Sequence, residues 1–164
     1  ILVMLIVWRN DKSMTISQHA AAHKSSYLMM LIVQSITLPM LFLFFIKALT
    51  PVAHLPLLFE VIVGIACLGL LIAAWVPDTK GWKSKVHQLC AYGAAVLIIP
   101  SLTLLSASAH ISPFAKWMAI IVLSYDVAAI VLLTVLNKAK ENHLYIQAAY
   151  IFLFALTTIA AVYT

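Results

Sequence analysis

Five apolar runs, each long enough to cross a bilayer, dominate this chain of 164 residues. They cover residues 27–46, 57–76, 87–109, 114–136 and 144–163, with short polar loops between them. A helix of about 20 residues spans a hydrocarbon core of about 30 Å, and in lipid each segment must satisfy its own backbone hydrogen bonds. The runs do not alternate apolar and polar residues, as the strands of a membrane barrel do. We therefore predict an all-α fold, a polytopic transmembrane helix bundle, in a single domain of residues 1–164.

A shorter apolar run precedes the first loop, from Ile1 to Trp8. At a helical rise of 1.5 Å per residue, it reaches only about 12 Å. No small-residue cleavage site follows it, which argues against a secretory signal. We interpret it as the end of a first helix, which gives a bundle of about six helices with the first one truncated.

The composition supports a membrane location, with 65% hydrophobic and 9% charged residues. Soluble domains carry about 25% charged residues, so this chain has too few charges for a water-exposed surface. The net charge of +5 sits in short loops, where it indicates topology and lipid headgroup contacts rather than nucleic-acid binding. Membrane lipids are therefore the expected partners, and other membrane subunits or further copies of the chain are also possible partners.

Basic residues are distributed unevenly between the two ends of the predicted bundle. Alternate loops of an up-and-down bundle lie at the same end. One end, which we call the basic end, holds eight of the ten lysines and arginines in loops 9–26, 77–86 and 137–143. Loops 47–56 and 109–113 form the opposite end. Because short cytoplasmic loops are enriched in Lys and Arg, we predict a multi-pass protein of the cell membrane with its basic end in the cytoplasm.

Asp126 is an acidic residue near the middle of the run 114–136. A charge at that depth costs about 2.5–3.5 kcal/mol on insertion scales, and no basic side chain lies at matching depth in the sequence. Gln34 and Thr37 lie at a similar depth and share a helical face. Asp126 is either a proton-accepting carboxyl or part of a polar ligand pocket, or it is a neutral, hydrogen-bonded packing residue.

Four of the six histidines fall at the basic end: His19, His23, His87 and His143. His19 and His23 would share one face of a short interfacial helix that we expect in the first loop. Three imidazoles and a carboxylate could complete a tetrahedral zinc site. A haem held by His87 and His143, which lie at matched depth at the membrane edge, is a further option. The alternative is that these histidines are polar residues at the membrane interface.

The loop between the second and third spanning runs carries Asp78, and His87 follows it after nine residues. Pro77 and Gly81 allow the chain to turn there. Asp78 could then orient His87 at the level of the lipid headgroups, or it could cap a turn while His87 serves as an interface residue.

Three short motifs resemble an uncharacterised family of six-helix bacterial and archaeal membrane proteins that carries only a domain-of-unknown-function label. They are Ile16-Ser17, the segment from Pro77-Asp78 to Val86-His87, and Glu141 followed by Gln147 and Tyr150. The family is distantly similar to the DRAM and Sfk-type membrane proteins. This chain departs from the family pattern in its last loop, which reads Lys-Glu-Asn-His without the usual Gly and Arg. The resemblance implies a membrane-integral regulator or a lipid-associated protein, without a catalytic mechanism.

Three functions follow from these residues. The first is a non-enzymatic bundle that binds lipids or partners, or a small subunit of a membrane assembly, with a polar pocket of Ser17, Asp78, His87 and Glu141. The second is a metal-dependent membrane hydrolase at the basic end. The third is a proton-coupled transporter or channel that uses Asp126. The chain has no P-loop, GxGxxG, HExxH or GxSxG motif, so an enzyme is the less favoured class.

Overall fold

A computed structural model describes residues 14–78, 81–136 and 142–163. These residues form helices and no strands, which confirms the all-α prediction. Five helices are long and apolar enough to cross a membrane: Lys24–Ala53, Leu57–Trp75, Trp82–Ala107, Pro113–Leu133 and His143–Tyr163. Each matches one of the five predicted runs. The run from Ile1 to Trp8, interpreted as part of a first helix, lies outside the described residues.

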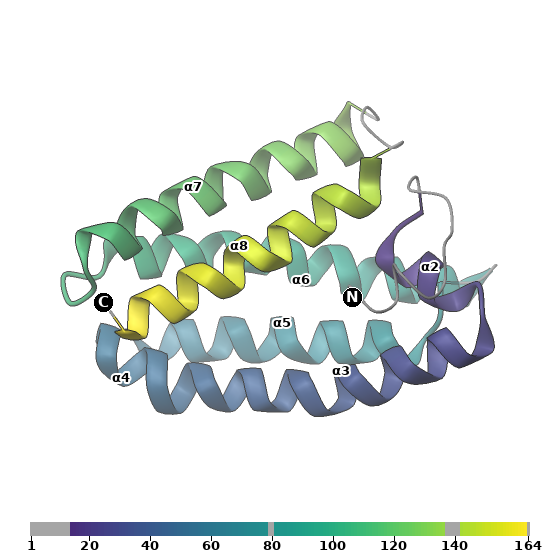
Figure 1. Cartoon of the computed structure of the whole chain (residues 1–164), viewed down its shortest axis with the longest axis horizontal. Coiled ribbons are helices and arrows are strands. Elements are labelled where there is room, and N and C mark those ends of the chain that lie inside the picture. Colours follow the sequence, from purple (N-terminus) through teal and green to yellow (C-terminus); the bar gives the residue numbers. More distant parts are fainter. Residues whose placement is uncertain (1–13, 79–80, 137–141, 164) are drawn as a thin grey trace.

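The helices follow each other along the chain in an antiparallel order (Figure 1). The elements are α2 (Ile16–Ala21), α3 (Lys24–Phe44), a π-helical turn η1 (Phe45–Leu49), α4 (Thr50–Ala53), α5 (Leu57–Trp75), α6 (Trp82–Ala107), α7 (Pro113–Ile130), a second π-helical turn η2 (Val131–Val135) and α8 (His143–Tyr163). Neighbours in the order α3, α5, α6, α7 and α8 are in contact, and α8 also contacts η1 and α4. The bundle therefore closes through its last helix.

The short helix α2 confirms that the first loop contains a short helix, and its place at the membrane interface stays a prediction. Thr15 is its N-cap and accepts a hydrogen bond from the backbone N–H of Gln18, whose side chain accepts one from the Thr15 backbone. This reciprocal capping box satisfies two backbone donors at the helix start. The helix is nevertheless brief, because it ends at Ala21.

The first spanning helix is longer than the sequence indicated. We expected a loop over 47–56, but the helix continues through η1 and α4 to Ala53. Pro51 does not break it. This proline directly follows the π-helical turn η1, where the Thr50 N–H bonds to the carbonyl of Phe45 and the regular helical hydrogen-bond pattern is already altered. The helix ends at His54, which has a left-handed conformation with φ of 47°.

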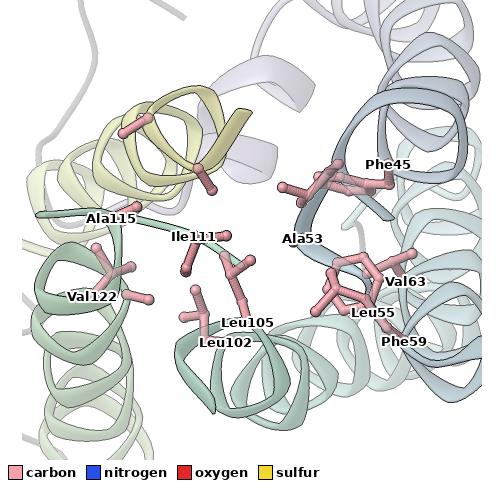
Figure 2. Packing of buried hydrophobic residues seen from close by; sticks show 14 of the residues in the cluster. Phe45, Ala53, Leu55, Phe59, Val63, Leu102, Leu105, Ile111, Ala115 and Val122 are labelled. Carbon is pink, nitrogen blue, oxygen red and sulfur yellow. The ribbon is translucent and has the colours of Figure 1, made fainter. Parts of the chain in front are cut away.

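The buried apolar core lies in the half of the bundle nearest the opposite end. Figure 2 shows side chains from the α3–α5 region facing side chains from α6, α7 and the turn between them. The cluster comprises Phe45, Leu49, Ala53, Leu55, Phe59, Val63, Cys67, Leu102, Leu105, Ile111, Ala115, Ala119, Val122, Ala160 and Ala161. None of these residues comes from the turns of the basic end.

Many large apolar side chains point away from the bundle, among them Leu57, Leu89 and Phe152. Such an exposed apolar surface is unfavourable in water but suits lipid. The five apolar helices are therefore those of an integral membrane protein, and the orientation of its two ends stays a prediction.

Candidate functional site

Asp78 joins two elements at the basic end. The side-chain amide of Gln18 donates a hydrogen bond to its Oδ2 at 3.1 Å, and the hydroxyl of Ser84 donates to its Oδ1 at 2.6 Å. Gln88 donates in turn to the Ser84 hydroxyl at 3.2 Å. Both carboxylate oxygens of Asp78 are therefore used to fasten α2 to the first turn of α6.

His87 is buried near the start of α6, with 4% of its surface exposed. Its Nδ1 lies 2.8 Å from the carbonyl oxygen of Ala73 and 2.8 Å from that of Val76. These carbonyls lie at the end of α5, where backbone acceptors lack helical partners, so a proton on Nδ1 serves both of them. In the described part of the chain, Asp78 and His87 share no hydrogen bond, and the pair suggested by the sequence does not form.

The other predicted pocket residues lie beside this network or outside the described residues. Ser17 is partly buried on α2, and the backbone N–H of the preceding Ile16 donates to the side-chain carbonyl of Gln147 at 3.0 Å. This contact joins α2 to α8. Glu141 lies outside the described residues. The structure thus brings Ser17, Asp78 and His87 to one end, where the polar atoms of Asp78 and His87 bind other parts of the protein.

The histidines do not assemble into a metal site in the part of the chain that the structure describes. No group of three His, Cys, Asp or Glu residues that could hold a metal ion is found there. His19, His87 and His143 are buried, whereas His23 is exposed. The expected shared helical face of His19 and His23 is wrong, because α2 ends at Ala21 and His23 is the extended N-cap of α3.

Asp126 occupies the inner face of α7. Ala115, Ala119 and Val122 precede it at helical spacing, and all four side chains are buried. Asp126 is 3% exposed, and its Oδ2 has no hydrogen-bond partner among the residues that the structure describes. Buried polar atoms are nearly always hydrogen-bonded in folded proteins, so this oxygen is an exception that calls for an explanation.

Tyr150 lies on α8, which packs against α7, and it is within electrostatic range of Asp126. Its hydroxyl is also buried and has no hydrogen-bond partner in the described part of the chain. Nearby, the hydroxyl of Tyr125 donates to the backbone carbonyl of Ile146 at 3.2 Å, which joins α7 to α8. Two adjoining helices therefore place two unsatisfied polar groups inside the membrane-spanning bundle.

The sequence suggested different neighbours for Asp126. Gln34 is partly buried and Thr37 is exposed on α3, a helix whose main helical neighbour is α5. In the described residues, neither side chain forms a hydrogen bond with Asp126. Sequence reasoning missed Tyr150 as the neighbour, although its helical spacing from Gln147 and Thr157 was available as a signal.

Comparisons with known protein families, with curated proteins and with solved structures give no match. The resemblance to the six-helix membrane family stays a prediction.

Proposed function

We propose that this integral membrane protein binds and releases a proton at Asp126, as a proton-coupled transporter or as a channel subunit. The observation that carries the proposal is the buried carboxyl oxygen of Asp126 in a spanning helix, which has no hydrogen-bond partner in the described ranges 14–78, 81–136 and 142–163. Ionisable residues within spanning helices are costly, and they commonly mark ion or substrate pathways.

The alternative reading of Asp126, as a neutral packing residue, explains less. A packing residue would be expected to satisfy its polar atoms with neighbouring groups, because an unsatisfied buried group costs about 1–3 kcal/mol. Thr157 and Thr158 behave in that way, since their hydroxyls donate to carbonyls of their own helix. Asp126 and Tyr150 instead leave a donor and acceptors available in one place, as a site for a proton or a small polar solute requires.

The basic end gives less support to the other two functions. A headgroup-binding pocket needs free polar atoms, whereas both oxygens of Asp78 and Nδ1 of His87 already bind protein groups. A metal-dependent hydrolase needs at least three converging ligands, and the described residues contain no such group.

Infrared spectroscopy of the protein in lipid vesicles tests the proposal directly. A protonated carboxyl in an apolar site gives a C=O stretching band that disappears when the proton leaves. In the wild-type protein, we expect this band to be present at acidic pH and absent at alkaline pH. In Asp126→Asn, we expect the band to be absent at both. The matched control is Glu60→Gln on α5, which should retain the band. A band that persists unchanged in Asp126→Asn would remove Asp126 as the proton-binding group.

A further inference from the structure

The inner face of α8 changes character along its length. Six residues of α8 follow one another at steps of four and three residues, and we call them the inner row: His143, Gln147, Tyr150, Phe154, Thr157 and Ala161. This spacing places them on one face of the helix, and His143, Thr157 and Ala161 are buried. The inner row has polar side chains that can bind protons or hydrogen-bond water from His143 to Tyr150, and an aromatic side chain at Phe154.

The polar part of the inner row connects the basic end to the proposed proton site. His143 lies at the start of α8, and Gln147 is one turn further along, where it contacts α2. Tyr150 follows with its unsatisfied hydroxyl, on the helix that packs against the Asp126 helix. Imidazole, amide and phenol groups each offer both donors and acceptors, so the segment carries the side-chain types that can pass a proton by hydrogen bonds.

Beyond Tyr150, aromatic rings occupy the space toward the opposite end. The Tyr150 and Phe154 rings are stacked with centroids 6.3 Å apart. Phe154 meets Phe45 edge to face at 6.0 Å, and Phe45 meets Phe59 in the same manner at 6.1 Å. These rings come from α8, η1 and α5, and Phe45 is 2% exposed. Phenylalanine rings offer no hydrogen bonds to water, so this cluster opposes passage of a proton.

We infer that Asp126 exchanges its proton with the aqueous phase at the basic end, through the side chains of His143, Gln147 and Tyr150. Phe45, Phe59 and Phe154 close the site toward the opposite end. The inference rests on the proposed function, since it assigns a route and a side to the same proton site. The transfer balances without any other reactant, because the proton that the Asp126 carboxylate gains is lost by water at the basic end.

The rate of hydrogen–deuterium exchange at the Asp126 carboxyl tests this route. Vesicles carrying the protein are mixed rapidly with D2O, and the shift of the carboxyl band is followed in time. We expect Tyr150→Phe and Gln147→Leu each to slow the exchange by about tenfold, the rate equivalent of one lost hydrogen bond. The matched control is Tyr145→Phe, an exposed tyrosine on α8 that lies outside the inner row.

Two outcomes separate the inference from the proposed function. If the band is present and disappears in Asp126→Asn, but Tyr150→Phe and Gln147→Leu both exchange at the wild-type rate, the route is wrong and the proton site stands. If the band is unaffected by Asp126→Asn, the proton site itself is wrong. Two conservative substitutions are used so that a folding defect in one leaves the other as a test.

The assignment of sides has its own measurement. In vesicles that hold the protein in one orientation, a rapid acidification outside should protonate Asp126 only when the basic end faces outward. Phe154→Ala should open the closed side and allow protonation from either direction. Protonation of the wild-type protein from the opposite end would overturn the assignment of sides.

Discussion

At the opposite end of the bundle, side chains such as Phe45, Leu102 and Val122 pack into a continuous apolar core. At the basic end, hydrogen bonds that Asp78 accepts from Gln18 and Ser84 join α2 to α6, and His87 on α6 donates to two carbonyls at the end of α5. Apolar packing involves many small contacts that leave little freedom of movement. Single hydrogen bonds can be broken and replaced by bonds to water at modest cost. The difference indicates a rigid opposite end and a basic end that can open to water.

Asp126 lies where these two regions meet. It continues the inner face of α7 immediately after Val122, the last residue that α7 contributes to the core. On α8, Tyr150 and Phe154 mark the same change from polar to aromatic. A proton site at this boundary has a hydrogen-bonding region on one side and a packed apolar region on the other. One-sided access then follows from the way in which the two ends are built.

The largest effect should come from breaking the apolar end. Phe45→Ala removes a ring that contacts Phe59 and Phe154 and leaves a cavity, which costs about 3 kcal/mol or more. The free energy of unfolding can be measured by titrating the protein from mild detergent into sodium dodecyl sulfate. The control is Phe152→Ala, whose ring is 68% exposed and should contribute little. Similar losses in the two variants would show that the apolar core does not hold the opposite end.

At the basic end, His87→Ala should have the next largest effect. It leaves the carbonyls of Ala73 and Val76 without their donor, at a cost of about 1–3 kcal/mol. In His87→Asn, the side-chain amide lies near the former position of Nδ1 and should restore part of the loss. The same detergent titration measures both variants. If Asn and Ala behave alike, the imidazole matters for its volume and the hydrogen bonds do not hold this end.

Ser84→Ala tests the fastening of α2 and should have a smaller effect. It removes one of the two hydrogen bonds to Asp78, worth about 1 kcal/mol, while Gln18 still binds the other oxygen. We expect faster amide hydrogen exchange in α2 with little change in α7, as followed by mass spectrometry. Exchange that rises equally in α2 and α7 would contradict the idea that the basic end can loosen separately.

Sequence reasoning predicted the spanning helices but did not predict the hydrogen-bond partners of their polar residues. The five spanning helices follow from segment length and apolar composition, which physical constraints in lipid make decisive. The partners of Asp78 and His87 depend on how loops fold back, and loop length does not specify that. Depth in the bilayer suggested Gln34 and Thr37 as neighbours of Asp126, but depth does not indicate which helices are adjacent. The neighbour Tyr150 lies on α8, which follows α7 in the chain and contacts it.

The smallest effect should come from the pair of histidine rings at the opposite end. His54 and His110 lie with ring centroids 4.1 Å apart and planes tilted by 34°, but both side chains are exposed. We expect His110→Ala to change the free energy of unfolding by less than about 0.5 kcal/mol, as for most surface substitutions. Ser108→Ala is the informative partner variant, because its hydroxyl donates to the Ala53 carbonyl at 2.6 Å and joins the same two turns. If His110→Ala lowers the free energy of unfolding more than Ser84→Ala does, the opposite end also depends on contacts between polar side chains. The contrast between a packed end and a hydrogen-bonded end would then no longer explain one-sided access to Asp126.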